Sequence, residues 1–290
     1  MRKPTQFTYQ AVEIDLIADH KGRVAICVDD EGRMDASGRR VNRLTKGAVV
    51  RLIESLRFEK MKQGQVFSLN LPAGMAADAV DIVRLSRRAK VDEARAAGAS
   101  LAKVRGDADL MLVAGNAKYA AEIAFGLAMR DYSFVEHKTA SETSKGAVTV
   151  VCGKPDEVSA AAAPLMDVAE GAFMTRDLIN EPANVLTTTE FANRLVEMES
   201  LGLKVQVLDE DELLSLGMRT LLCVGQGSAA PSKVVVMEWN GGNSGDAPLA
   251  LVGKGVVFDT GGISIKPAAG MEDMTMDMGG AGVVAGTMRT

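Results

Sequence analysis

The sequence predicts an α/β protein with two domains, and its length and patterning carry this prediction. Its 290 residues exceed the roughly 100 to 200 that one domain usually needs. Short apolar runs alternate with stretches of helical periodicity along most of the chain. We expect an N-terminal α/β domain over residues 1–155, a linker helix over 156–180, and a C-terminal α/β domain over 181–290 with a mostly parallel central sheet.

The N-terminal part alternates predicted strands and helices. Residues 12–17, 23–28 and 66–71 have the composition of strands, and turn residues follow the second of them. Residues 44–58 carry apolar side chains at helical spacing, and the alanine-rich stretch 79–101 is also predicted to be helical. Neither a G-x-G-x-x-G run nor a P-loop follows these strands, so the sequence predicts no nucleotide site there.

A helix with Pro164 inside it is predicted over residues 158–180, at the junction of the two domains. It should end near Asn180, because Pro182 lacks an N–H group and disfavours a helical Glu181. Threonines at 187–189 are candidate N-caps for a following helix over residues 191–201.

The C-terminal part is predicted to contain four strands, at residues 204–208, 220–224, 233–239 and 248–252, with an acidic helix start at 209–212. The last three are strongly apolar. Strands of this kind are typical of a sheet that is covered on both faces.

Composition and charge exclude several classes of protein. The three cysteines (Cys27, Cys152 and Cys223) are far apart, so they predict neither a metal knuckle nor a disulfide framework, and they favour a reducing compartment. The N-terminus lacks the apolar stretch of a secretory signal, and no apolar window reaches the ~18 residues of a transmembrane helix, so we expect a cytoplasmic protein. Aromatic residues make only 4% of the chain, which argues against a stacking platform for single-stranded nucleic acid.

The two parts differ in charge. Residues 1–164 carry 25 Lys and Arg against 21 Asp and Glu, whereas the remainder carries 8 against 17. This asymmetry is consistent with two differently solvated surfaces, or with an acidic part that holds cations.

Charged residues gather directly after the last predicted strand. Lys254, Asp259 and Lys266 lie among glycine and apolar residues, and Glu272, Asp273 and Asp277 follow in a methionine-rich stretch. Ligands of open α/β sheets bind beyond the carboxyl ends of strands. Carboxylates that converge there would repel one another unless divalent cations such as Mg, Mn or Zn neutralise them.

Histidine is not the main ligand of such a site, because only His20 and His137 exist and both lie in the first half. Two interpretations of Lys254 stay open: it pairs with Asp259 to brace a loop, or it ligates a metal as a neutral amine. The methionines at 271, 274, 276 and 278 belong either to the core or to an apolar substrate pocket.

The run VGKGVVFDTGGISIKP at 252–267, followed by MEDMTMDMGGA at 271–281, resembles the first half of the active-site signature of the leucyl aminopeptidase family. The segments RDLINEPAN at 176–184 and VGQGS at 224–228 also resemble this family. The resemblance extends from about residue 170 to 290. It implies a cytosolic two-metal aminopeptidase of hexameric assembly, with two Mn or Zn ions per subunit and peptide substrates with leucine or another apolar residue first.

Residue by residue, the resemblance makes Lys254, Asp259 and Asp277 metal ligands, with Asp259 bridging the two ions. It makes Lys266 the catalytic lysine, which also contacts the substrate, and Met274 an apolar wall for the first side chain of the peptide. Residues 181–290 would then be the first part of the catalytic domain. Two close cations would polarise the scissile carbonyl, and Lys266 would stabilise the developing oxyanion.

One departure from the family pattern is that its N-T-D-A-E-G-R segment, which supplies a further Asp, Glu and Arg, does not occur in this sequence. Residues 283–290 read as a helix without a C-cap, so we expect a fragment of a longer protein.

A second hypothesis is a non-catalytic oligomeric or DNA-binding accessory protein of the same family. The cations at 39, 40, 43 and 46 form only a short cluster, which makes a nucleic-acid partner the weaker expectation.

Overall fold

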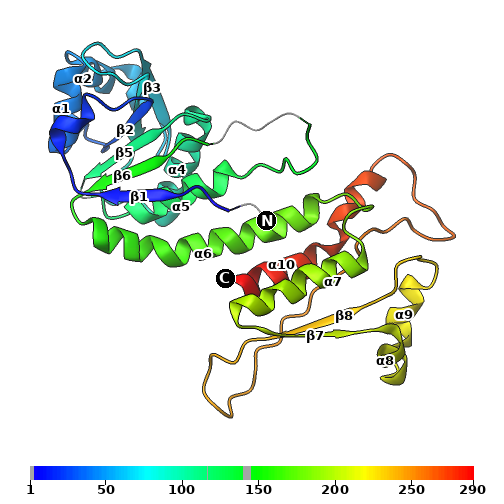
Figure 1. Cartoon of the computed structure of the whole chain (residues 1–290). Helices are drawn as coiled ribbons and strands as arrows, with labels where there is room; N and C mark the ends of the chain where they lie inside the picture. The colour runs from blue at the N-terminus through cyan, green and yellow to red at the C-terminus, as the bar shows by residue number, and fades with distance from the viewer. Residues whose placement is uncertain (1–2, 116, 140–144) are drawn as a thin grey trace. The chain divides into compact units, whose positions relative to one another are not determined.

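The computed structural model describes residues 3–115, 117–139 and 145–290, and the chain forms two compact units, Lys3–Ala169 and Glu170–Thr290 (Figure 1). The boundary between them lies within one helix, α6 (Pro155–Asn180), which runs through Pro164 without ending there. Strands and helices alternate, so the predicted α/β class is confirmed. Each unit is described by itself below.

The N-terminal unit is built on a six-stranded sheet in the order β1-β6-β5-β2-β4-β3. All neighbouring strands are parallel except β3 and β4, which are antiparallel. The strands are β1 (Phe7–Gln10), β2 (Arg23–Val28), β3 (Val66–Asn70), β4 (Ala79–Arg84), β5 (Leu110–Gly115) and β6 (Val148–Cys152). The helices are η1 (Ile14–Ile17), α1 (Ala36–Leu44), α2 (Ala48–Ile53), α3 (Leu56–Glu59), α4 (Val91–Arg105), α5 (Ala120–Asp131) and the first part of α6.

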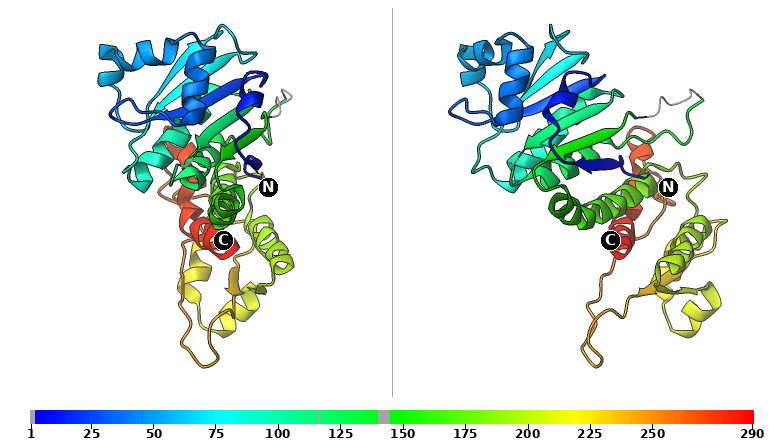
Figure 2. Two further views of the ribbon diagram at one scale, coloured as in Figure 1. Left: turned by 90° about the vertical axis from the view of Figure 1, so that its left-hand side faces the viewer. Right: turned by 60° about the vertical axis from the view of Figure 1, so that its left-hand side comes forward.

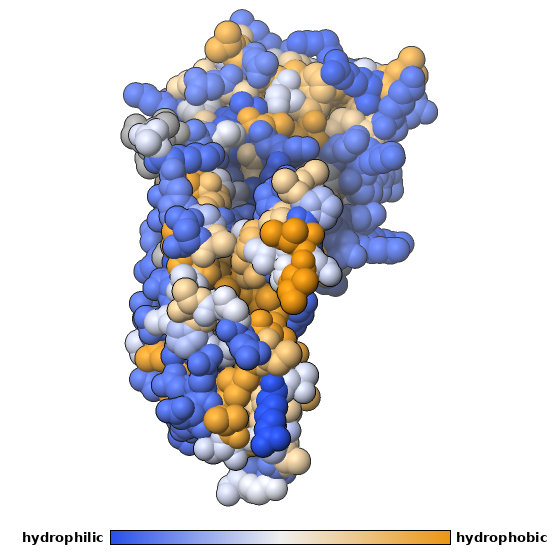
Figure 3. All heavy atoms as spheres, turned by 90° about the vertical axis from the view of Figure 1, so that its right-hand side faces the viewer, coloured by the Kyte–Doolittle hydropathy of each residue, from blue (hydrophilic) through white to orange (hydrophobic). Residues whose placement is uncertain are grey.

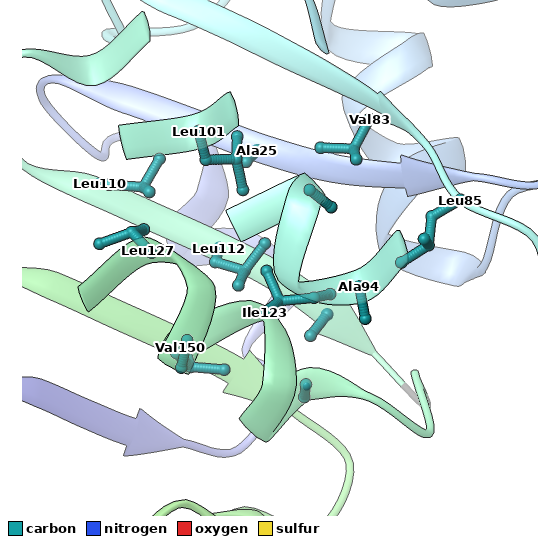
Figure 4. Packing of buried hydrophobic residues seen from close by; sticks show 14 of the residues in the cluster. Ala25, Val83, Leu85, Ala94, Leu101, Leu110, Leu112, Ile123, Leu127 and Val150 are labelled. Carbon is teal, nitrogen blue, oxygen red and sulfur yellow. The ribbon is translucent and has the colours of Figure 1, made fainter. Parts of the chain in front are cut away.

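Helices cover both faces of this sheet (Figures 1 and 2). Side chains alternate across a strand, so on β2 Ala25 packs toward α4 and α5 while Val24 and Ile26 pack toward α1, α2 and α3. Leu110 and Leu112 of β5 join Leu101 of α4 and Ile123 of α5 in the first of these two cores (Figure 4). The continuous apolar strands are therefore buried on both sides.

Helices α4 and α5 pack at very short distance because glycine replaces a side chain in each. A Cβ added at Gly98 would lie 1.9 Å from the carbonyl oxygen of Ile123, and one added at Gly126 would lie 2.0 Å from that of Arg95. The carboxyl ends of the two helices are also tied together by a buried ion pair between Arg105 and Asp131, whose carboxylate accepts a further bond from Thr5 at 2.8 Å. Nη1 of Arg105 also donates to the main-chain carbonyls of Ala108 and Gly146, each at 3.0 Å, which offsets part of the cost of burying the pair.

The C-terminal unit contains a two-stranded antiparallel sheet and a set of helices. Its elements are the last part of α6, α7 (Thr188–Val196), η2 (Glu197–Leu201), β7 (Lys204–Leu208), α8 (Glu210–Ser215), α9 (Arg219–Gly225), β8 (Val234–Glu238), η3 (Met271–Met278) and α10 (Gly279–Arg289). As predicted, α6 ends at Asn180. Thr187 caps α7, with its hydroxyl accepting from the N–H group of Glu190 at 3.2 Å.

Helix α10 packs against the last part of α6 through small residues. The Thr175 hydroxyl donates to the carbonyl of Gly282 at 2.9 Å, and Arg289 pairs with Glu170 at 2.9 Å. Met174 and Leu178 of α6, Leu195 of α7 and Met278 form the core of this unit together.

Three predictions in the N-terminal part are wrong in detail. Residues 12–17 hold only the short helix η1. The stretch 44–58 is interrupted by Gly47 at φ 80° and by the new N-cap Ser55, which gives the short helices α2 and α3. The stretch 79–101 begins as the buried strand β4, and α4 starts only after Lys90, where the Glu93 side chain accepts from the Lys90 N–H group at 2.7 Å.

Two of the predicted C-terminal strands are also wrong. Residues 220–224 lie in the helix α9, since a short apolar run does not distinguish a buried strand from a helix. Residues 248–252 have neither helix nor strand structure, and all five are exposed, including the large hydrophobic residues Leu249, Leu251 and Val252. The mostly parallel sheet of the structure therefore lies in the N-terminal unit, while the described part of the C-terminal unit has an antiparallel pair.

No helix in the described ranges combines the length and the apolar character that a membrane span requires.

We predict that Gly98→Ala destabilises the chain. The helix propensity of alanine adds ~1 kcal/mol of stability, but the overlap with the Ile123 carbonyl forces α4 and α5 apart, and overpacking costs about 1–3 kcal/mol. The midpoint of urea unfolding should therefore fall. Gly227→Ala, at a glycine with no atom within 4 Å of the added Cβ, is the matched control and should leave the midpoint unchanged. An equal or higher midpoint for Gly98→Ala would show that the helices are free to separate.

We also predict that the three cysteines differ in reactivity. Burial raises the pKa of the Cys27 thiol to about 12, and burial also raises that of Cys152, whereas Cys223 is exposed on α9. Because the thiolate is the reactive form, iodoacetamide at pH 8 should modify Cys223 first and leave Cys27 unmodified until the chain unfolds. Mass spectrometry of digested protein measures this order, and early alkylation of Cys27 would contradict it.

Candidate active site

The structure brings four of the predicted site residues together in two ion pairs. The Lys254 ammonium lies 2.7 Å from Oδ1 of Asp277, and the Lys266 ammonium lies 2.6 Å from Oδ2 of Asp259. Lys254 also contributes to the electrostatic environment of Asp259, which links the two pairs into one cluster. The sequence left open a pairing of Lys254 with Asp259, but in the structure the bonded partner of Lys254 is Asp277.

Lys254 meets Asp277 because two glycines allow their backbones to touch. A Cβ added at Gly253 would lie 2.4 Å from the carbonyl group of Gly280, and one added at Gly280 would lie 2.9 Å from the Lys254 nitrogen. The N–H group of Ala281 donates to the Lys254 carbonyl at 2.9 Å. The start of α10 therefore holds the segment that carries Lys254, and Asp277 precedes that start by only two residues.

Lys266 returns to Asp259 through a tight loop. Gly261 and Gly262 both have positive φ, 95° and 78°, which side-chain-bearing residues rarely adopt. The Lys266 N–H group closes the loop on the Thr260 carbonyl at 2.9 Å, and the Gly261 N–H group donates to Asp259 at 2.8 Å. The two glycines of the T-G-G run thus determine where the Lys266 ammonium lies.

The charges of the cluster compensate one another. The Lys266 ammonium, the Gly261 N–H group and the more distant Lys254 hold the pKa of the Asp259 carboxyl below its usual value. Lys254 and Asp259 lie among glycine and apolar residues in the sequence, but the structure does not bury their charges. Their side chains are 60% and 39% exposed, so solvent stabilises these charges as well.

The donor set fits a divalent cation. Oδ2 of Asp277 is buried and has no hydrogen-bond partner among the residues that the structure describes. Such an atom is costly unless a cation or donor meets it. Across residues 3–115, 117–139 and 145–290 no group of three or more His, Cys, Asp and Glu side chains is close enough to hold a metal ion. The cluster therefore offers two carboxylates and the amine of Lys254 rather than a full set of acidic ligands.

The other carboxylates of the region do not join the cluster. The Glu272 side chain accepts from the Gly270 N–H group at 3.0 Å, which fixes it at the start of η3. Met274 lies on η3 and is partly exposed, whereas Met278 on the same helix is fully buried. The core interpretation is thus correct for Met278, and the substrate-pocket interpretation of Met274 stays a prediction. His20 and His137 lie in the N-terminal unit.

The loop around the cluster carries exposed apolar side chains. Ile263 and Ile265 are 107% and 71% exposed, and Leu249 and Val252 precede the cluster with similar exposure. Figure 3 shows orange, apolar patches among the hydrophilic atoms of the C-terminal unit. Exposed apolar patches of this kind commonly mark a surface that another segment or molecule covers.

Sequence reasoning identified the charged residues but missed the contacts that position them. The close approach of Gly253 to Gly280 gives no local signal, because the two glycines lie in different motifs. The one sequence signal for this contact is that both segments, G-K-G at 253–255 and G-G-A at 279–281, are rich in glycine.

Residues 173–290 match the model of the "Cytosol aminopeptidase family, catalytic domain". In sequence, the chain is similar over most or all of its length to proteins named "Probable cytosol aminopeptidase". That of Dinoroseobacter shibae is 59% identical over 278 residues, which cover 96% of this chain and 57% of the relative. That of Cereibacter sphaeroides is 53% identical over 290 residues, which cover 100% of this chain and 59% of the relative. The chain thus spans less than two thirds of the length of these relatives.

Solved structures agree with the fold. The bottromycin maturation enzyme BotP in complex with Mn superimposes with a TM-score of 0.68 at 29% identity, covering 92% of this chain and 55% of that one. A tomato leucine aminopeptidase mutant gives a TM-score of 0.78 at 18% identity, covering 99% of this chain and 59% of that one, and it supports the fold alone.

Proposed function

We propose that the protein to which this chain belongs is a metal-dependent aminopeptidase of the cytosol aminopeptidase family, because residues 173–290 match the catalytic-domain model of that family and the similar curated proteins carry that name. It would release N-terminal residues, leucine and other apolar ones first, from peptides in the cytoplasm. The observation that carries this proposal is the convergence of Lys254, Asp259, Lys266 and Asp277 in one charged cluster.

Lys254, Asp259 and Asp277 would hold the metal, with Asp259 shared between two ions of Mn or Zn. Two observations support this assignment: Oδ2 of Asp277 is buried without a hydrogen-bond partner among the described residues, and the Asp259 side chain is 39% exposed. When bound, divalent cations would supply Lewis acidity at the scissile carbonyl and a water of lowered pKa. Lys254 can ligate only as the neutral amine, which requires the loss of its proton to solvent.

Lys266 would be the catalytic lysine and would also contact the substrate. Its ammonium donates to the main-chain carbonyl of Asp259 at 3.2 Å and to the Asp259 carboxylate. The loop therefore holds a positive charge beside Asp259, the proposed metal ligand. This charge would stabilise the oxyanion that develops on the attacked carbonyl. Met274, partly exposed on η3, would contact the first side chain of the peptide.

The active protein requires further ligands. Three side chains serve two ions here, whereas each ion takes roughly four to six donors. We propose that the site is completed by residues outside this chain, in the part of the relatives that it does not span, and that the complete protein is a hexamer. The alternative of a non-catalytic or DNA-binding accessory protein lacks a comparable observation.

We predict that Asp259→Ala in the full-length protein loses more metal than any other single change in the cluster, because a shared ligand serves both ions. Calorimetric titration of the metal-free protein with Mn measures stoichiometry and affinity. Asp246→Ala, at an exposed aspartate of the same unit outside the cluster, is the matched control. Unchanged stoichiometry and affinity in Asp259→Ala would remove Asp259 from the ligand set.

For Lys266→Ala in the full-length protein we predict a fall in kcat on the order of 10² to 10³, the effect of removing an oxyanion donor, with the metal content unchanged. The exposed Lys204, which pairs with Glu238 on the surface, provides the control Lys204→Ala. Metal content and kcat are measured on the same samples. If both fall together, Lys266 is a ligand or a structural residue.

We predict that the 290-residue chain alone, loaded with Mn or Zn, does not hydrolyse leucine p-nitroanilide. Water can fill open coordination positions, but it cannot replace the anionic charge that holds two cations close together. Turnover that both a chelator and Asp259→Ala abolish would contradict this prediction. It would mean that Glu272, Asp273 or another group of this chain completes the site.

A further inference from the structure

A shallow hollow of about 550 Å³ lies at the β3 edge of the N-terminal sheet, far along the chain from the charged cluster. Its apolar floor includes Met61 and two consecutive strand residues, Val66 and Phe67. Val66 packs with the core on the α4 side and Phe67 with the core on the α3 side. The hollow therefore wraps around the edge of the sheet, where both faces meet.

The rim of this hollow is basic. Arg57 on α3, Lys60 after it and Lys103 on α4 line it, and no Asp or Glu does. None of the three forms an ion pair with a carboxylate in the part of the chain that the structure describes. The Arg57 guanidinium lies 4.5 Å from the centre of the Phe67 ring, so a cation–π contact holds it over the floor. The rim thus presents positive charge that lacks a counter-charge.

The strand beside the hollow has free main-chain groups. Strand β3 is the last strand in the sheet order, and among the described residues its one neighbouring strand is β4. The Leu71 N–H group donates to the Asp78 carbonyl and the Arg84 N–H group to the Gln65 carbonyl, so residues 65 and 71 are hydrogen-bonded positions of the ladder. Bonding alternates along an antiparallel pair. The N–H and C=O groups of Val66, Ser68 and Asn70 therefore face away from β4, toward an additional strand.

We propose that this edge binds an extended acidic peptide, which adds a strand to β3 and places its carboxylates against the basic rim. The main-chain groups of Val66, Ser68 and Asn70 would supply the hydrogen bonds. Arg57, Lys60 and Lys103 would select acidic side chains, and the apolar floor would take the alternate, apolar ones. Charge complementarity favours this occupant, because a neutral or basic strand would leave three cations unpaired.

The test uses the complete natural protein and a fluorescent, N-acetylated peptide of about ten residues in which Glu and Val alternate. The acetyl group prevents aminopeptidase cleavage, so the result does not depend on the proposed function. Fluorescence anisotropy should show binding that weakens as salt increases. The double variant Arg57→Glu with Lys103→Glu should weaken binding by tenfold or more. Arg88→Glu with Lys138→Glu, the same charge change at exposed residues outside the hollow, should weaken it less than threefold.

Two further probes keep the proposal falsifiable if the double variant fails to fold, as circular dichroism would report. A peptide N-methylated at every second residue cannot complete the ladder and should lose binding, and a Lys-Val peptide should not bind. Equal binding of the N-methylated peptide would overturn strand addition. Binding of a single-stranded oligonucleotide in place of the Glu-Val peptide would overturn the choice of occupant, and no binding of any probe would overturn the site.

Discussion

The backbone contact between Gly253 and Gly280 is the constraint on which the geometry of the charged cluster depends. Each glycine lies next to or near a charged residue, Gly253 beside Lys254 and Gly280 three residues after Asp277. A Cβ on either would push the segment away from the start of α10. Helix α10 is in turn fixed on α6 by Thr175 and by the Arg289–Glu170 pair, so the cluster rests on the best-packed part of its unit.

This arrangement compensates charge without burying it. Two carboxylates and two ammonium groups alternate within bonding distance, which holds the pKa of the Asp259 carboxyl low while leaving one oxygen of Asp277 without a partner. Ammonium groups and divalent cations compete for the same carboxylate oxygens. Lys254 and Lys266 therefore stabilise the cluster in this structure, and we propose that a divalent cation bound to these oxygens would displace one or both ammonium groups.

Local patterns predicted well wherever local chemistry decides the structure. Helix α6 ends at Asn180 because a proline follows, and Thr187 caps α7 through its hydroxyl. The strand at 204–208 follows from the alternation of its side chains. The charged residues of the cluster were identified because charge among glycine and apolar residues is unusual. Predictions failed where partners distant in sequence decide: 79–84 is a strand because β2 and β3 flank it, and 248–252 has no ladder partner among the described residues.

Basic residues at a sheet edge commonly protect it from pairing with other chains, and Lys60 beside β3 could be explained in that way alone. Protection requires only that charge project into solvent. Arg57 instead lies over the Phe67 ring, and Lys103 comes from a helix rather than from the edge strand. Together with an apolar floor at Val66 and Phe67, these positions shape a surface in which positive charge is held around an apolar strand. Such a surface repels a basic strand, gives a neutral one no charge partner and attracts an acidic one, so the same cations that prevent unselective pairing would select the partner.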